Sequence, residues 1–305
     1  MDVRDGDALA PLLAGWTWSV TRRRWWVPGW TPPTRRIRRP QRPGHHGVTG
    51  PDVRRRGAPP GAGVVDGGLR QGRYHCGRHG LVDPLPRRRA DLDSGIFEHR
   101  CPACGDPVRW RLVDEAAAVR PRSLYAASKA AQEHYALAWS ESTGGSVVAL
   151  RYHNVYGPGM PRDTPYSGVA AIFRSSLEKG EPPRVFEDGG QMRDFVHVDD
   201  VAAANLAAAD LTAADRGGFT AANVCSGRPI SILQVAIALC EARGDSTAPV
   251  ITGQYRSGDV RHIVADPARA ADVLGFRAAV ARSRGCVISR SPRCADRYCE
   301  SPGGR

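Results

Sequence analysis

The chain has 305 residues, a net charge of +12 and eight Cys. Its length is enough for one large domain or two of moderate size. No apolar run approaches the length of a transmembrane helix, and the acidic start MDVRDGDALA lacks the basic-then-apolar pattern of a secretory signal. We therefore predict a cytoplasmic protein without a membrane span, whose Cys are free thiols or metal ligands.

Almost all of the positive charge comes from Arg, because Lys129 and Lys179 are the only Lys in the sequence. A charge of +12 would normally suggest a nucleic-acid partner. GC-rich codons, however, produce an excess of Arg, Gly, Pro and Ala whatever the protein needs. We therefore do not favour nucleic acid as the partner.

Residues 16–70 have an unusual composition. They hold five of the seven Trp and many Arg, Pro and Gly, but no Glu and no Lys, and they follow neither a helical nor a strand period. We predict that this segment is disordered. Within it, GHHGVTG (44–50) has the Gly-x-x-Gly-x-x-Gly spacing of a dinucleotide-binding loop, but it lacks the strand and helix that would aim amides at a pyrophosphate. We expect this spacing to be coincidental.

Two pairs of metal-binding side chains follow in residues 71–110. Cys76 and His79 are separated by two residues, as are Cys101 and Cys104, and about twenty residues lie between the pairs. Zn²⁺ takes four soft or imidazole ligands in a tetrahedron, and these residues supply three Cys and one His. We predict a structural zinc knuckle here; free thiols are the alternative.

Residues 71–277 alternate between strand-like and helix-like segments, which predicts an α/β fold. Asp199 or Asp200 and Ser231 are candidate N-caps, and Gly244 is a candidate helix stop. Residues 278–305 are again rich in Arg, and we expect a disordered tail. The expected elements are helices over 124–140, 201–214 and 231–243 and a buried strand over 146–151.

Tyr125-Ala-Ala-Ser-Lys129 is the sharpest catalytic signal. Residues four apart share a helix face, and an ammonium beside a phenol favours the phenolate and lowers the pKa of Tyr125. Tyr125 is thus a candidate general acid/base for an alcohol or sugar hydroxyl, and Lys129 could also hold a cofactor ribose. An ordinary surface pair is the alternative, because the spacing also arises by chance.

Five segments in order carry a resemblance to a known family. They are LYAASKAAQEHYA (124–136), LRYHNVYGPG (150–159), GQMRDFVHVDDVAAA (190–204), NVCSGRPISI (223–232) and YRSGDVRHIVADPARAADVLGF (255–276). Over residues 71–277 the chain resembles the extended short-chain dehydrogenase/reductase family, specifically its NAD-dependent nucleotide-sugar epimerases and dehydratases of the UDP-glucose 4-epimerase type.

The resemblance implies roles for individual residues. Tyr125 and Lys129 match the catalytic pair, which also contacts the cofactor. His153 departs from the Phe common in the family, so the resemblance does not define the shape of the sugar pocket. Without the resemblance, residues 256–261 would be interpreted as a solvated charged face. The remaining implied contacts are Asp2 and Val3 with the adenine of NAD, Tyr152 with the nicotinamide through its backbone, and Asn154, Arg193, Arg256 and Asp259 with the nucleotide-sugar.

The resemblance also implies the architecture. We expect a Rossmann-like doubly wound parallel sheet that lacks its first βαβ unit, with the zinc-knuckle insertion and a C-terminal substrate-binding part. Homodimerisation through the Tyr125 helix is a further expectation. The expected organisation is a remnant of the NAD-binding domain (1–15), the Arg-rich segment (16–70), the insertion (71–110), the catalytic and substrate-binding part (111–277) and the tail (278–305).

The composition of residues 16–70 has a genetic explanation that the sequence allows. Codons for residues 64–70 can be re-read one base along as Ser-Ser-Met-Val-Val-Tyr-Gly, the end of the family's catalytic-Ser strand. We therefore hypothesise that residues 16–70 are translated out of frame and that the tail is a further shift. Resequencing the gene tests this hypothesis, and a reading frame without shift sites would refute it.

The function expected from the resemblance is NAD-dependent epimerisation of a nucleotide-sugar. No acid/base pair marks a dehydratase, so an isomerase is favoured over a lyase. Two alternatives remain: a basic zinc-knuckle protein that binds nucleic acid through Arg and Trp, and a folded but inactive remnant, since no pyrophosphate loop or catalytic Ser is written in the chain.

Overall fold

The computed structural model describes residues 62–65, 72–121, 123–158, 160, 168–214, 217–243, 247–256 and 258–280. Three parallel strands in the order β1-β5-β10 form the main sheet. The central strand β5 is buried along almost its whole length, as expected for a parallel strand covered on both faces. These strands are β1 (Ala62–Val65), β5 (Ser146–Tyr152) and β10 (Gly218–Val224).

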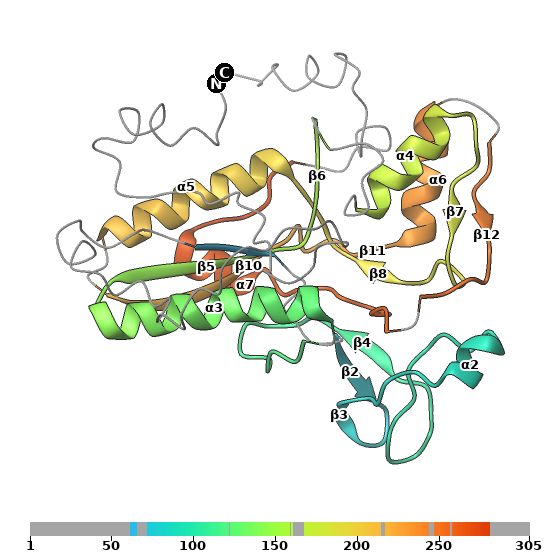
Figure 1. The fold of residues 1–305 in the computed structure, drawn as a ribbon, viewed down its shortest axis with the longest axis horizontal. Helices are drawn as coiled ribbons and strands as arrows, with labels where there is room; N and C mark the ends of the chain where they lie inside the picture. Colours follow the sequence, from blue (N-terminus) through green and yellow to red (C-terminus); the bar gives the residue numbers. More distant parts are fainter. Residues whose placement is uncertain are drawn as a thin grey trace, which may run out of the picture.

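Helices cover both faces of this sheet, so that it forms the middle of three layers (Figure 1). Side chains of β5 alternate between the faces: Val148 and Leu150 pack with Ala204 and Ala208 of one helix, whereas Arg151 reaches a helix on the other face. The three covering helices are α3 (Leu124–Thr143), α5 (Val198–Ala214) and α7 (Ala268–Leu274).

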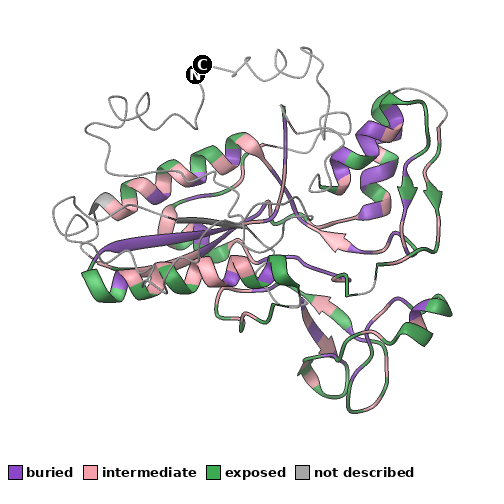
Figure 2. Cartoon of the chain, in the orientation of Figure 1, coloured by how far each residue is buried: buried purple, intermediate pink, exposed green. Residues whose placement is uncertain are grey.

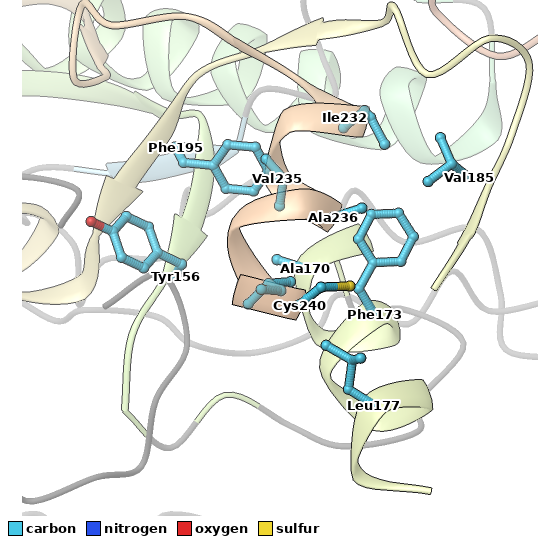
Figure 3. Close-up of a cluster of buried hydrophobic side chains, with 11 residues drawn as sticks. Tyr156, Ala170, Phe173, Leu177, Val185, Phe195, Ile232, Val235, Ala236 and Cys240 are labelled. Atoms are coloured by element: carbon cyan, nitrogen blue, oxygen red, sulfur yellow. The ribbon is translucent and has the colours of Figure 1, made fainter. Parts of the chain in front are cut away.

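A second apolar core lies beside the sheet, between two helices and short strands (Figure 3). Phe173 and Leu177 of one helix meet Val235 and Leu239 of the other. Helices α4 and α6, strands β7 and β12, and the pairs β6–β9 and β8–β11 make up this part. Their bounds are α4 (Val169–Glu178), α6 (Ile232–Arg243), β6 (Asn154–Tyr156), β7 (Arg184–Val185), β8 (Met192–Arg193), β9 (Phe195–His197), β11 (Ile230–Ser231) and β12 (Val250–Ile251).

Residues 73–111 form a small separate unit, which we call the hairpin module. Three antiparallel strands in the order β3-β2-β4 and one short helix build it. It projects from the body beneath the main sheet in the view of Figure 1. Many of its residues are coloured as exposed in Figure 2. Its elements are β2 (Arg73–Cys76), β3 (Gly80–Val82), α2 (Arg89–Asp93) and β4 (Arg109–Arg111).

Two helix starts test the predicted caps. The prediction for α6 is confirmed: the Ser231 hydroxyl accepts from the Gln234 N–H at 3.1 Å, and the Gln234 amide oxygen accepts from the Ser231 N–H at 2.9 Å. The prediction for α5 is wrong, because this helix follows β9 directly from Val198 and places Asp199 and Asp200 in its first turn. Negative charge there complements the helix dipole.

The expectation that residues 16–70 are disordered is wrong for Ala62–Val65. These small or β-branched residues pair in parallel with the edge of β5 and form β1. The rest of that segment, including GHHGVTG, lies outside the described residues, as do Gly244 and the tail from residue 281. Among the residues that the structure describes, no helix is long and apolar enough to cross a membrane.

Candidate active site and metal centre

The carboxyl ends of β1, β5 and β10 lie along one edge of the main sheet. Tyr152, the last residue of β5, is paired with Val65 of β1 and with Val224 of β10, which are also the last residues of their strands. Open parallel α/β sheets bind their ligands outside this edge. The residues that reach it are therefore the candidates for a site.

Helix α3 carries Tyr125 and Lys129 to this edge. Further along the helix, Glu133 forms an ion pair of 2.5 Å with Arg151, which is one residue from the end of β5. Tyr125 is eight residues before Glu133 and therefore lies about 12 Å nearer the start of the helix, at a rise of 1.5 Å per residue. The helix start thus extends past the end of β5.

Tyr125 and Lys129 contact each other as their spacing predicts. The Lys129 Nζ lies 5.5 Å from the centre of the Tyr125 ring, and about half of Tyr125 is exposed. Burial lowers the pKa of Lys129. An ammonium at this distance favours the phenolate, so the pair has the arrangement of a general base that is open to a ligand.

Residues 152–154 continue from β5 along the same edge. The Tyr152 hydroxyl donates to Asn205 Oδ1 at 2.8 Å, so the ring is directed toward α5. Its backbone forms the end of β5. Among the described residues, neither ring nitrogen of His153 has a hydrogen-bond partner, nor does Asn154 Oδ1, and all three atoms are buried. Burial, together with the charges of Arg193 and Arg151, lowers the pKa of His153 to about 3. Buried atoms of this kind normally have a partner, so a polar ligand or water is expected beside them.

Arg193 joins this edge to residues 255–262, which we call the 255–262 loop. Its Nη2 donates to the Val260 carbonyl at 2.7 Å and its Nη1 to the Arg261 carbonyl at 2.9 Å. Asn154 lies close by, because its N–H donates to the Asp194 carbonyl at 3.0 Å. The structure therefore brings Arg193 together with Asn154 and with the chain that carries Arg256 and Asp259.

Arg256 and Asp259 themselves are exposed. The Arg256 guanidinium lies 5.4 Å from the centre of the Phe186 ring, and the Asp259 carbonyl accepts from Arg87 Nη2 at 2.9 Å. Both side chains are accessible to a ligand on the surface of the 255–262 loop.

The interpretation of residues 256–261 as a solvated charged face is wrong for Arg261. This residue is 1% exposed and donates to the carboxylates of Glu98, Glu187 and Asp188 at 2.6 to 2.9 Å. Burial lowers the pKa of Arg261, but the hydrogen bonds and charges of Asp188 and Glu98 outweigh it and hold the pKa above its usual range. No spacing in the sequence links Arg261 to Glu98, so sequence reasoning missed this network.

His262 is a second buried residue that the motifs did not indicate. Its Nδ1 accepts from the Met192 N–H at 3.1 Å, so the other nitrogen carries the proton and donates to Glu98 Oε2 at 2.9 Å. Burial lowers the pKa of His262, against the opposing effect of Glu98. Burial raises the pKa of Glu98, but its bonds to His262 and Arg261 outweigh burial and keep it low. Glu98 is thus a charged acceptor between two neighbouring side chains.

The four predicted metal ligands meet in the hairpin module. Their ligand atoms all lie within 4.8 Å of one another. Cys76 Sγ lies 3.6 Å from His79 Nδ1 and 3.6 Å from Cys104 Sγ, and Cys101 Sγ lies 3.5 Å from His79 Nδ1. Four ligands at about 2.0 to 2.3 Å from one tetrahedral zinc ion would be separated by comparable distances.

Two similar turns build this cluster. In each, a Gly four residues after the first Cys adopts a positive φ, which is 67° at Gly80 and 76° at Gly105. Side chains with a Cβ rarely adopt that backbone conformation. Backbone N–H groups, first that of Arg78, and the His79 ring lower the pKa of Cys76 to about 6, which favours the thiolate that binds metals.

The predicted site residues therefore fall into three groups. Tyr125 pairs with Lys129, Arg193 contacts the 255–262 loop near Asn154, and the four metal ligands cluster in the hairpin module. Tyr152 ends the central strand between the first two groups. Asp2 and Val3, the expected adenine contacts, lie outside the described residues.

Known proteins resemble the central part of this chain. Residues 105–224 match the model of the NAD dependent epimerase/dehydratase family. A dTDP-L-rhamnose 4-epimerase of Burkholderia thailandensis is 38% identical over 208 residues, which is 67% of this chain and 54% of the relative. A UDP-glucose 4-epimerase of Mycolicibacterium smegmatis is 35% identical over 169 residues, 55% of this chain and 51% of the relative. The chain thus spans about half the length of these relatives.

Solved structures show the same fold. The UDP-glucose 4-epimerase of Thermotoga maritima with UDP-glucose is 32% identical, with a TM-score of 0.53 over 60% of this chain and 57% of that protein. MoeE5 in complex with UDP-glucose and NAD is 34% identical, with a TM-score of 0.50 over 58% of this chain and 56% of that protein. The parallel sheet, its flanking helices and the matched segment give one conclusion: over this region, the chain belongs to the NAD-dependent epimerase/dehydratase family.

Proposed function

We propose that this chain acts as an NAD-dependent epimerase on a nucleotide-sugar. The observation that carries the proposal is the Tyr125–Lys129 pair, which lies past the carboxyl end of the central strand with the phenol exposed. The relatives support the substrate class, because they are named for dTDP-L-rhamnose and UDP-glucose. The favoured substrate is therefore a sugar linked to a nucleoside diphosphate.

The described residues fit the nicotinamide end of NAD. Tyr125 and Lys129 stand at the edge where the backbone of Tyr152 ends the strand, and Tyr125 and Lys129 would hold the nicotinamide ribose through their polar groups. When bound, NAD supplies the acceptor and donor of a hydride. The residues proposed for its adenine end, Asp2 and Val3, lie outside the described part of the chain.

Tyr125 moves the proton in the proposed reaction. As a phenolate it would take the proton of a sugar hydroxyl, and the Lys129 ammonium would stabilise the phenolate. A hydride would leave the carbon that bears this hydroxyl and later return to the opposite face of that carbon. Tyr125 would then give the proton back to the oxygen. The net change is an inverted carbon centre, with no gain or loss of atoms.

The other end of the substrate is proposed to lie beside the 255–262 loop. Arg193 contacts this loop near Asn154, and the loop itself carries Arg256. Guanidinium groups suit a pyrophosphate because their donors match its oxygens. Asp259 is proposed to accept a hydrogen bond from the nucleotide. Unpartnered Asn154 Oδ1 is consistent with a polar ligand at this position.

The activity is tested by turnover of a panel of UDP- and dTDP-sugars with NAD. We expect Tyr125→Phe to lower kcat at least about 100-fold, because it removes the general acid/base. Tyr135→Phe is the matched control on the same helix, and we expect unchanged turnover.

Two results would replace the proposal. Cooperative melting without turnover of any sugar would identify an inactive remnant. Salt-dependent binding to random-sequence DNA in place of turnover would support a nucleic-acid function.

We also propose that Cys76, His79, Cys101 and Cys104 hold a structural Zn²⁺ ion. These four side chains would fill all four positions of a tetrahedral zinc ion, which is typical of structural and not catalytic zinc. Metal analysis of the purified chain should give one zinc per chain, and Cys101→Ser should lose it. A stoichiometry near zero in chain purified with zinc present would contradict this proposal.

A homodimer through α3 is a further proposal. Leu124 and Tyr135 on this helix are 86% and 76% exposed, which is unusual for large apolar side chains and is consistent with an interface. Light scattering should give twice the mass of one chain, and the mass of a single chain would contradict the dimer.

A further inference from the structure

The hairpin module holds the 255–262 loop at both ends. At the start of the loop, the Tyr255 hydroxyl donates to Asp93 at 2.5 Å. In its middle, Arg87 Nη2 donates to the Asp259 carbonyl at 2.9 Å. These two contacts come from the same short stretch of the module: Arg87 lies just before α2, and Asp93 is the last residue of this helix.

The end of the loop is held more tightly. Glu98 accepts from Arg261 at 2.6 and 2.9 Å and from His262 at 2.9 Å. The Tyr74 ring meets the edge of the His262 ring, with centres 6.1 Å apart, and the Trp110 ring lies 6.4 Å from it. Charged and aromatic contacts from the module therefore surround the last two residues of the loop.

On its other side the loop rests on the body of the protein. Arg193 donates to the Val260 and Arg261 carbonyls, and Arg261 donates to Glu187 and Asp188. The loop thus lies between the proposed pyrophosphate contact Arg193 and the hairpin module. Its geometry depends on both.

The hairpin module has little apolar core of its own. Its buried cluster consists of Tyr74, Cys76, Cys101 and Val108, and two of these four are proposed metal ligands. Units of this size usually need a metal or disulfides to fold, because they bury too little apolar surface. A bound metal ion would supply the missing stabilisation.

The position of the ligands in the chain makes the link specific. His79 and Cys101 flank residues 80–100, so a metal ion bound to both would close this segment into a loop. The segment includes Arg87, Asp93 and Glu98, which make the polar contacts with the 255–262 loop. Closing a loop in advance removes entropy that these contacts would otherwise have to overcome.

We infer that the metal-bound hairpin module positions the 255–262 loop, so that metal occupancy controls how well the chain binds the nucleoside diphosphate of its substrate. The second half of this inference rests on the proposed function. The module is a positioning element, since the proposed contacts with the substrate are made by Arg256, Asp259 and Arg193, which lie outside it.

Amide hydrogen exchange on the full chain tests the positioning directly. We compare the zinc-loaded protein, the protein stripped with a chelator, and the stripped protein after Zn²⁺ is restored. We expect stripping to speed exchange in residues 255–262 at least tenfold and restoration to reverse it, while β5 (Ser146–Tyr152) stays protected. Unchanged exchange in the loop, or an equal loss of protection in β5, would overturn the inference.

A variant separates the contact from the metal. Glu98→Ala should keep one zinc per chain yet speed exchange in residues 255–262 at least threefold. Asp91→Ala is the matched control, because Asp91 also lies in the module but pairs with Arg88 on its surface. Exchange in the loop that responds equally to both variants, or to neither, would count against the inference.

Calorimetric titration with UDP connects the loop to the substrate. Stripping should weaken UDP binding at least tenfold, Glu98→Ala at least threefold, and Asp91→Ala less than twofold. Equal UDP affinity with and without zinc would overturn the inferred control of binding. A zinc-loaded chain that protects the loop but does not bind UDP would support the positioning role and contradict the proposed function instead.

Discussion

At the scale of single residues, His153 places a polar ring in an unfavourable buried environment. It is 3% exposed, and both of its ring nitrogens are buried without a hydrogen-bond partner among those residues. Burial, helped by Arg193 and Arg151, lowers its pKa to about 3. The histidine is therefore neutral in the folded state near neutral pH.

This position gives a pH-dependent prediction. The folded-state pKa is depressed below the ordinary value near 6.5, so the unfolded chain binds the extra proton first and stability is lost as the pH falls from about 6.5 toward 3. From pH 7 to pH 5 this one group should remove about 2 kcal/mol of unfolding free energy. We expect His153→Phe to reduce the loss by about that amount and to raise stability at pH 7, because it also removes two unpaired polar atoms.

Urea unfolding at pH 5 and pH 7 measures the effect. His134→Phe on the exposed face of α3 is the control and should leave the wild-type pH dependence in place. If His153→Phe and the wild type lose the same free energy on acidification, the side chain is not buried as neutral histidine.

At the scale of elements, α6 shows how a local signal and a tertiary core combine. Ser231 and Gln234 exchange two hydrogen bonds at its start, and its buried face joins α4 in the core of Figure 3. The capping box selects where the helix begins, and packing against α4 supplies most of its stability.

The cap makes a separable contribution. Ser231→Ala removes the acceptor for the Gln234 N–H and should lower the unfolding free energy by about 1 kcal/mol. Ser142→Ala, near the end of α3, is the control, because its hydroxyl bonds back to the Trp139 carbonyl and caps nothing. Thermal or urea unfolding compares the two, and equal small effects would show that the box does not stabilise α6.

At the scale of the whole molecule, Arg261 ties the hairpin module to the body. It reaches Glu98 in the module and Glu187 and Asp188 in the body with one guanidinium. Arg87 of the module also pairs with Glu187, at 2.9 Å. Among the described residues, charged groups thus add to the aromatic contacts of Tyr74 and Trp110 with His262 in linking the two parts.

Removing this link should be costly. Arg261→Met leaves carboxylates without their common partner and should lower the unfolding free energy by about 3 kcal/mol, at the low end for a broken buried pair. The reason for the low value is that Glu98 and Asp188 keep part of their hydration and Glu187 keeps Arg87. Calorimetry should also show a separate, earlier transition for the module.

Arg269→Met is the comparison, since exposed Arg269 makes a single bond to the Ala221 carbonyl. We expect it to cost less than about 1 kcal/mol, as is usual for surface changes. A single unchanged transition for Arg261→Met would show that the ionic network does not hold the module in place.

Features that depend on near neighbours in the chain were predictable. The Tyr125–Lys129 pair, the start of α6 and the four metal ligands all follow from short spacings, because helices and tight turns bring residues a few positions apart together. The start of α5 was missed because β9 leads into it without a loop. The strand at Ala62–Val65 was missed because its flanking composition does not indicate a core.

The sequence by itself determined the family, and it predicted the contact between Tyr125 and Lys129 and the grouping of the four candidate metal ligands, since these depend on residue type and local spacing. Only the tertiary structure decided that Glu98 meets Arg261 and His262, more than 160 residues away. It also decided that the 255–262 loop lies between Arg193 and the hairpin module. The physical reason is that a buried charge needs an opposite charge close to it in the folded chain. Periodicity in the sequence does not indicate which distant residue will be close.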